Sequence, residues 1–229
     1  IPSNVLAVYS NKNNNAPDYR RLVGASLSTA ADTVTLSNDL SPWVRAEGCP
    51  LRKEIIMGAL GDGPQLEFTV WNGNTWGNKL LFNATSNPLL KTFEIAYESL
   101  SGDALAVGWT GTNQDLAYSV WDGASWLPAT PQVFSSPAGT TTTQLICAAS
   151  HPGRDDILFG TVNSAEDIRL HHWNGSTFSD LGIIETDSHT INFGIMTIVF
   201  EQQSGEALII WSKWNTAGLY YRTWSPTGG

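Results

Sequence analysis

The chain has 229 residues, of which 41% are hydrophobic and only 14% are charged, and its formal net charge is −9. A chain of this length can bury a full core, and this composition excludes an intrinsically disordered protein. An acidic surface repels phosphate backbones, so we expect no nucleic-acid partner, and no apolar run is long enough for membrane insertion.

One 18-residue pattern recurs five times along the chain and aligns without gaps. Its copies end at residues 22, 71, 121, 173 and 224, so successive copies lie 49, 50, 52 and 51 residues apart. Each copy starts with four or five apolar residues, continues through a polar turn and closes with an alternating segment. A continuous apolar run predicts a strand covered on both faces, whereas alternation predicts a strand with two unlike faces.

Two further strands complete each copy. Asn72-Gly73, Asp122-Gly123 and Asn174-Gly175 follow three of the copies, and such pairs are strong hairpin signals because they tolerate positive φ. Each pair precedes an aromatic residue that begins another strand. The remaining strand is predicted upstream of each later copy, over Trp43–Cys49, Phe93–Glu98, Gln144–Ala149 and Ile195–Glu201.

Four short antiparallel strands per repeat of about 50 residues are typical of a propeller blade. We therefore predict an all-β, propeller-like array of about five four-stranded antiparallel blades in a single domain, with copies over 1–42, 43–91, 92–142, 143–194 and 195–229. A β-sandwich is the alternative, but it does not explain the repeat.

The terminal blades are predicted to be incomplete, because the chain opens on the second strand of a copy and closes after a third. Three explanations stay open. The chain is a fragment of a longer repeat protein, or the ring closes imperfectly, or the open edges pair with another copy of the chain.

The sequence gives no sign of catalysis. It contains no glycine-rich phosphate loop, no nucleophile elbow and no Cys-x-x-Cys pair. His171 and His172 are neighbours in a strand, so their rings point to opposite faces and cannot share a metal. Glycosidases use paired carboxylates, but the acids found here recur just before the second strand, which favours solvated turns: Glu54, Asp103, Asp156 and Glu206. We expect no enzyme, no cofactor and no metal, and two small buried cysteines rather than a disulfide, Cys49 and Cys147.

The aromatic residues allow two interpretations. They wedge between blades, or some of them form sugar-stacking platforms in clefts between blades, beside polar hydrogen-bonding groups. The polar neighbours differ between copies, which limits a sugar site to one or two positions. The candidate ligand-binding residues are Trp76, Trp121, Trp126, Arg169, His171, Trp173, Arg222 and Trp224.

The segment Leu116–Trp126, LAYSVWDGASW, resembles the repeat of bacterial and fungal β-propeller lectins that bind fucose and related sugars. Those repeats have a strand that ends in Trp-Asp-Gly, followed by another Trp. The first and fifth copies depart from this pattern, at Leu22-Val23-Gly24 and Trp224-Ser225-Pro226. The resemblance implies a propeller fold and an extracellular or cell-surface protein that binds glycans. The alternative is a structural subunit of a surface or filamentous assembly, a homo-oligomer or polymer joined through open β-edges.

Overall fold

A computed structural model gives the structure of the chain. It describes residues 5–11, 16–23, 25–36, 43–61, 65–83, 90–135, 140–189, 195–214 and 216–226. In these ranges the regular structure is entirely β, as predicted, and the strands form five separate antiparallel sheets. We number the sheets 1 to 5 in chain order.

The three central sheets each have four strands that follow one another in chain order. Sheet 2 contains β5 (Trp43–Gly48), β6 (Ile55–Leu60), β7 (Gln65–Trp71) and β8 (Trp76–Asn83). Sheet 3 contains β9 (Phe93–Tyr97), β10 (Ala104–Trp109), β11 (Leu116–Trp121) and β12 (Trp126–Ser135). Sheet 4 contains β13 (Thr143–Ser150), β14 (Ile157–Asn163), β15 (Ile168–Trp173) and β16 (Phe178–Glu185).

In the part of the chain that the structure describes, the two terminal sheets are incomplete, as predicted. Sheet 1 contains β1 (Leu6–Tyr9), β2 (Asp18–Val23), β3 (Ser26–Leu27) and β4 (Asp32–Thr33), and sheet 5 contains β17 (Met196–Phe200), β18 (Ala207–Ser212) and β19 (Leu219–Trp224). β1 and β2 correspond to β6 and β7, the second and third strands of sheet 2, so sheet 1 has no first strand among the described residues. Its fourth strand is reduced to two short pieces, β3 and β4, which both pair with β2.

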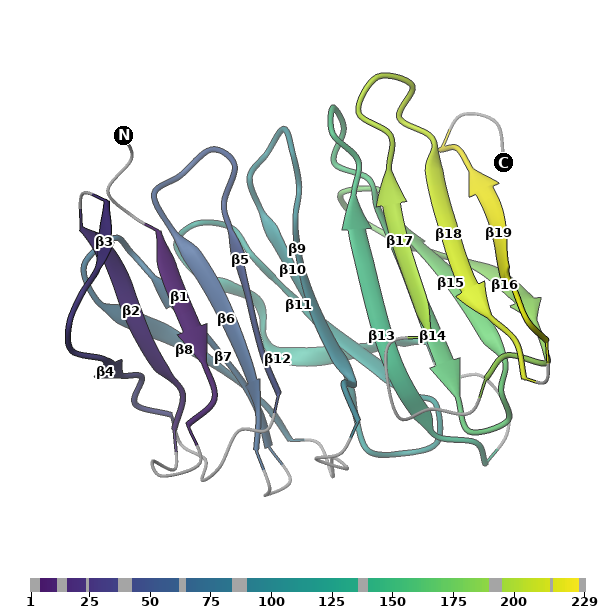
Figure 1. Ribbon diagram of the computed structural model, residues 1–229, viewed down its shortest axis with the longest axis horizontal. Coiled ribbons are helices and arrows are strands. Elements are labelled where there is room, and N and C mark those ends of the chain that lie inside the picture. The colour runs from purple at the N-terminus through teal and green to yellow at the C-terminus, as the bar shows by residue number, and fades with distance from the viewer. Residues whose placement is uncertain are drawn as a thin grey trace.

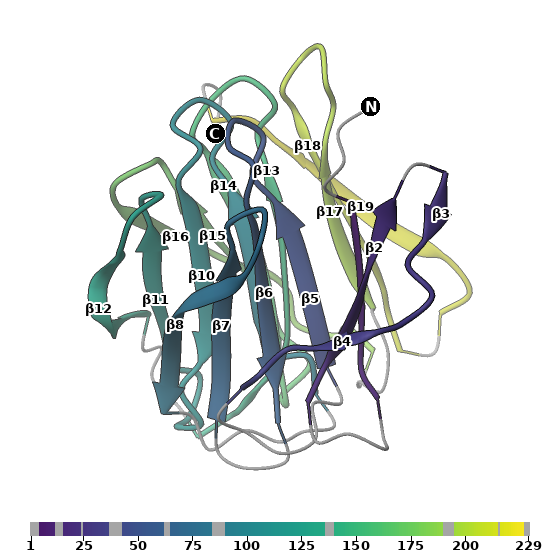
Figure 2. The same cartoon turned by 90° about the vertical axis from the view of Figure 1, so that its left-hand side faces the viewer.

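The sheets stand side by side in a row, with sheet 1 and sheet 5 at opposite ends (Figure 1). Figure 2 looks onto sheet 1 from its end of the row. In the described part of the chain no strand of sheet 1 pairs with a strand of sheet 5.

The core consists of four apolar clusters, one at each boundary between neighbouring sheets. The cluster between sheets 2 and 3, for example, joins Phe68 and Phe82 to Phe93 and Trp126. β6, β10 and β14 are buried on both faces, because each lies in a sheet that is covered on both sides. The predicted packing of both sheet faces against neighbours is confirmed for sheets 2, 3 and 4.

The repeat has one irregularity that the gapless alignment misses. Ile55 lies opposite Trp71 and Ile157 opposite Trp173, whereas Ala104 lies opposite Trp121. The hairpin of sheet 3, and likewise that of sheet 5, is therefore one residue longer than those of sheets 2 and 4. With this register, the residues that stand just before the second strand of sheets 2, 3, 4 and 5 are Glu54, Asp103, Asp156 and Glu206, respectively.

Candidate functional site

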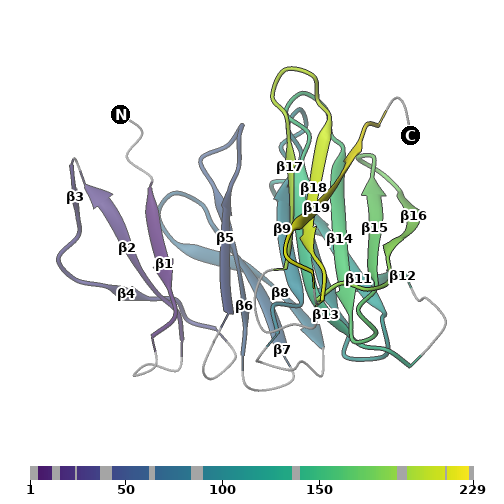
Figure 3. The ribbon, with the colours of Figure 1, turned by 45° about the vertical axis from the view of Figure 1, so that its right-hand side comes forward.

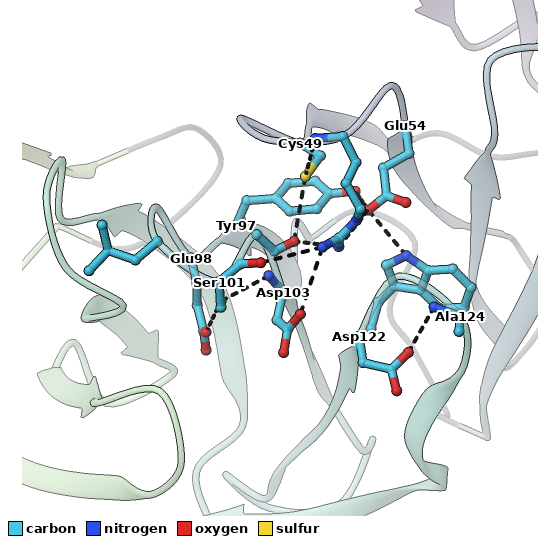
Figure 4. Close-up of polar contacts among 12 residues, drawn as sticks. Cys49, Glu54, Tyr97, Glu98, Ser101, Asp103, Asp122 and Ala124 are labelled. Carbon is cyan, nitrogen blue, oxygen red and sulfur yellow. Dashed lines mark hydrogen bonds and ion pairs between the residues drawn. The ribbon is translucent and has the colours of Figure 1, made fainter.

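Two kinds of turn meet at one rim of the row: the turn between the first and second strands of a sheet, and the turn between the third and fourth. The second kind contains the Asn-Gly or Asp-Gly pairs, whose glycines have φ values of 98°, 94° and 90° at Gly73, Gly123 and Gly175. In sheet 3, Asp122 Oδ1 accepts the backbone N–H groups of Ala124 and Ser125 at 2.8 and 2.7 Å (Figure 4). These bonds favour the charged carboxylate and lower the pKa of Asp122.

Glu54 lies at the centre of a polar cluster between sheets 2 and 3 (Figure 4). Its Oε1 accepts Arg52 Nε at 3.0 Å and Arg52 Nη2 at 2.8 Å, both from the same turn. From sheet 3 it also accepts Tyr97 Oη at 3.4 Å and Trp121 Nε1 at 3.2 Å. The other oxygen, Oε2, has no hydrogen-bond partner among the described residues. One carboxylate thus joins two sheets and keeps an acceptor oxygen free.

The Arg52 guanidinium is held in place from three directions. Nη2 donates to the carbonyl of Gly102 at 2.5 Å, and Nη1 donates to that of Ser101 at 3.4 Å. A Cβ at Gly123 would lie 3.0 Å from Arg52 Cζ, so the guanidinium needs a glycine at this turn position. The hydrogen bond to Glu54 raises the pKa of Arg52. The side chain remains 31% exposed, so its charge is fixed in position and still reaches solvent.

The burial of Tyr97 matters for the chemistry of the cluster. Burial raises the pKa of the phenol, and the nearby Glu54 carboxylate raises it further. Tyr97 therefore stays protonated and acts as a hydrogen-bond donor to Glu54. The cluster as a whole presents the Arg52 cation between two carboxylates, those of Glu54 and of Asp103, whose Oδ1 lies 3.9 Å from Arg52 Nη1.

A cleft of about 270 Å³ lies beside Trp121. Its walls come from β8 of sheet 2 and, in sheet 3, from the end of β11, the turn that follows and β12: Asn78, Lys79, Leu80, Trp121, Ala124, Ser125, Trp126 and Ala129. The rings of Trp121 and Trp126 meet here at 5.4 Å between centroids, and Trp126 Nε1 donates to the carbonyl of Asn78 at 2.7 Å. The lining is mixed, because Asn78, Lys79 and Ser125 stand beside the two largely buried tryptophans, and a cleft that combines polar and apolar groups can receive a small ligand.

A related cluster lies between sheets 4 and 5. Asp156 is buried, its carboxylate pairs with Arg154, and its Oδ1 lies 2.6 Å from His172 Nε2. The imidazole packs against Trp224 of sheet 5, with ring centroids 4.8 Å apart. An arginine and an acid two residues apart thus face a tryptophan of the next sheet at both boundaries.

The boundary between sheets 3 and 4 is built differently. Trp173 Nε1 donates to Glu98 Oε1 at 2.6 Å, so the carboxylate comes from the end of the first strand. Phe134 stacks on Phe178 with ring centroids 3.7 Å apart and fills the place next to the tryptophan. Among the described residues, no arginine pairs with the carboxylate at this boundary.

The predicted candidate residues lie at several boundaries rather than in one site. Trp121 and Trp126 meet in the cleft, whereas Trp76 packs on Trp71 and Tyr19 between sheets 1 and 2. Arg169, His171 and Trp173 share the face of β15 that packs towards sheet 3, where His171 and Trp173 are buried. Arg222 is exposed and Trp224 is half-buried at the edge of sheet 5. The wedge interpretation holds for Trp71, Trp121 and Trp173, which are buried between sheets.

The interpretation of the recurrent acids as solvated turn residues is wrong for two of them. Asp156 is buried, and the side chain of Glu54 is only 9% exposed, because each accepts hydrogen bonds from two sides. Glu206 is exposed, as expected. The missed signal is an arginine two residues before the acid, which occurs as Arg52-Lys53-Glu54 and Arg154-Asp155-Asp156 but not before Glu206.

Cys49 and Cys147 are both free, as predicted, although partly rather than fully buried. The described residues contain no group of three or more His, Cys, Asp or Glu side chains placed to hold a metal ion. They also contain no helix of the length and apolarity that would cross a bilayer.

Solved structures with this fold include lectins. The fucose-specific lectin from Aleuria aurantia, described as a six-bladed β-propeller, is 14% identical with a TM-score of 0.57, over 96% of this chain and 70% of the lectin. The BP39L lectin from Burkholderia pseudomallei is 12% identical with a TM-score of 0.72, over 100% of this chain and 65% of the lectin. SapL1 lectin, solved with α-methyl fucoside, is 12% identical with a TM-score of 0.57, over 96% of this chain and 73% of that chain.

These likenesses show that the chain has a β-propeller fold. No family model and no curated protein sequence matches it.

Proposed function

We propose that the chain is a non-catalytic, lectin-like protein, extracellular or at a cell surface, that binds carbohydrate at the rim between sheets 2 and 3. The observation that carries this proposal is the Glu54 cluster. Arg52 keeps one Nη1 N–H that the four hydrogen bonds described above do not use, and Glu54 keeps a free acceptor oxygen, both beside Trp121. Adjacent hydroxyl groups of a saccharide are simultaneously donors and acceptors, so a neighbouring cation and anion can bind both. Ala124 and Ala129 give the cleft some exposed apolar surface, which suits the C–H face of a sugar ring.

The boundary between sheets 4 and 5 supports a second, weaker site. Arg154 and Asp156 repeat the charge pair, and Trp224 is more accessible than Trp121. Asp156 is one methylene shorter than Glu54, and His172 rather than an indole N–H completes its hydrogen bonds. We expect this site to prefer a differently oriented pair of hydroxyl groups.

The test is a glycan array followed by calorimetry, with α-methyl fucoside as the first monosaccharide because structural neighbours are solved with it. The variants are Arg52→Ala and Glu54→Gln, with Glu206→Gln as the matched control, since Glu206 occupies the same repeat position but is exposed. Loss of two charge-assisted hydrogen bonds should weaken binding about 10- to 100-fold in the first two variants and leave the control unchanged. Absence of binding to every glycan, or equal effects of all three variants, would overturn the proposal.

A second candidate function is a structural subunit that assembles by pairing of open strand edges. β19 forms the last strand of a three-stranded sheet, and β1 is the first strand of sheet 1, so both edges lack a partner strand among the described residues. An unpaired edge is a template for strand addition. Electron microscopy would show filaments or rings, and a proline at an edge position of β19, Tyr221→Pro, would abolish them.

A further inference from the structure

The outer face of sheet 5, which points away from sheet 4, is uncharged. The strand register places eight residues on it: Thr197, Val199, Leu208, Ile210, Ser212, Leu219, Tyr221 and Thr223. Figure 3 shows sheet 5 at the end of the row, in front of sheet 4. A sheet with one face in water normally carries polar and charged residues on that face. Here Val199, Leu219 and Tyr221 are 51%, 74% and 69% exposed.

The corresponding positions in the other sheets are covered. Leu208 corresponds to Ile56, Leu105 and Leu158, which are all fully buried by the following sheet. Tyr221 corresponds to Phe68 and Leu170, which are buried as well. Sheet 5 therefore presents the kind of residue that elsewhere in this molecule contacts another sheet, and an exposed apolar face of this kind marks an interaction site.

Sheet 1 is a poor partner for this face. At the other boundaries the first strand of one sheet covers the second strand of the sheet before it, as Phe93 covers Gly58 and Met196 covers Gly160. Sheet 1 has no such strand in its described part, and its own free face includes Arg20 beside Ala7. A second copy of sheet 5 fits better, because an uncharged face meets itself without repulsion. Two-fold dimers built from one self-complementary surface are also the commonest oligomers.

We propose that two copies of the chain form a two-fold symmetric dimer through the outer faces of their fifth sheets. This association packs sheet on sheet and does not depend on pairing of strand edges. It is also independent of glycan binding, because the Glu54 cluster lies between sheets 2 and 3. Three strands of five or six residues cover roughly 10 by 20 Å, a footprint smaller than a standard interface, so the dimer is weak and dissociates on dilution.

Sedimentation equilibrium of the whole chain from about 5 to about 500 µM tests this proposal. We expect a monomer–dimer equilibrium. Val199→Lys and Tyr221→Lys each place an unpaired charge in the interface and should raise the dissociation constant at least about 10-fold. Tyr9→Lys, on the free face of sheet 1, is the matched control and should leave it unchanged. Thermal melts confirm that all three variants fold.

Three outcomes would overturn the proposal. The first is a monomer over the whole concentration range. The second is an equal loss of association in Tyr9→Lys, which would indicate head-to-tail packing of sheet 5 on sheet 1. The third is growth beyond the dimer that resists Val199→Lys but is lost in Tyr221→Pro, which would indicate edge pairing. Glycan binding measured on the same variants keeps the outcome separate from that of the proposed function.

Discussion

Trp121 and Glu54 join two sheets through a single hydrogen bond, with the indole N–H donating to a carboxylate oxygen at 3.2 Å. The same oxygen receives the guanidinium of Arg52. The contact therefore belongs both to the packing of sheet 3 on sheet 2 and to the candidate ligand site.

This link should be measurable as a coupling energy. Trp121→Phe removes the donor and keeps an aromatic ring, and Glu54→Gln removes the charge and keeps the shape. In a double-mutant cycle followed by urea unfolding, we expect the two changes to be coupled by about 1 kcal/mol. The pair Trp121→Phe and Glu206→Gln, which do not touch, should be additive. Equal additivity in both pairs would contradict the link.

Gly58 should not tolerate a side chain, because sheets 2 and 3 approach closely at β6. A Cβ there would lie 2.7 Å from Phe68 Cε1 and 2.8 Å from Phe93 Cε2, and these rings cannot move independently of the core. Gly58→Ala should lower the free energy of unfolding by about 1–3 kcal/mol. Gly77→Ala is the control, since no atom lies within 4 Å of its Cβ position. Chemical denaturation that gives the same midpoint for both variants would show that the sheets separate more easily than the structure indicates.

Trp173→Phe should destabilise the protein more at pH 7 than at pH 4. Burial raises the pKa of Glu98, and hydrogen bonds from Ser101 and Trp173 partly offset this rise. When a carboxyl group has a raised pKa in the folded state, its protonated form favours folding. This contribution to the free energy of unfolding is lost as the pH rises through that pKa. Removing the indole N–H raises the pKa further, so the added cost, about 1–3 kcal/mol, appears at neutral pH. A cost that is independent of pH would mean that the indole matters only for packing.

His171 should make the protein less stable in mild acid. Burial lowers its pKa to about 4, although Asp180 nearby acts in the opposite direction. Between the ordinary histidine pKa and this value the unfolded chain binds a proton that the folded chain does not, so stability falls by about 3 kcal/mol as the pH falls through this window. His171→Leu removes the titration and should flatten this part of the curve of unfolding free energy against pH. An unchanged slope would assign the acid sensitivity to other groups.

The repeat in the sequence predicted most of the fold, because alternation and turn residues act locally. The strand predicted over Phe93–Glu98, for example, is β9 at Phe93–Tyr97, and the Asp122-Gly123 pair forms a turn with positive φ. The one-residue difference between hairpins was not predictable from a gapless alignment, because the extra residue lies in a turn whose length the strands tolerate.

The candidate site was only partly predictable. Trp121 and Trp126 were identified from their repeat positions, and they do meet in a cleft. Glu54 was missed because its partners, Tyr97 and Trp121, lie 43 and 67 residues away in the chain, and only the packing of neighbouring sheets brings them to it. A strand pattern predicts which face a residue occupies but not which turn lies beside it on the next sheet.

Each apolar cluster is shared by only two adjacent sheets, which affects how the molecule unfolds. Stability becomes approximately a sum of nearest-neighbour terms along the row, as in linear repeat proteins, rather than the property of one common interior. Sheets 2, 3 and 4 are held on both flanks and sheet 5 on one. Native-state hydrogen exchange should therefore follow a gradient along the row. The amides of β18 should exchange through partial openings of lower free energy, and those of β10 only when several sheets have separated.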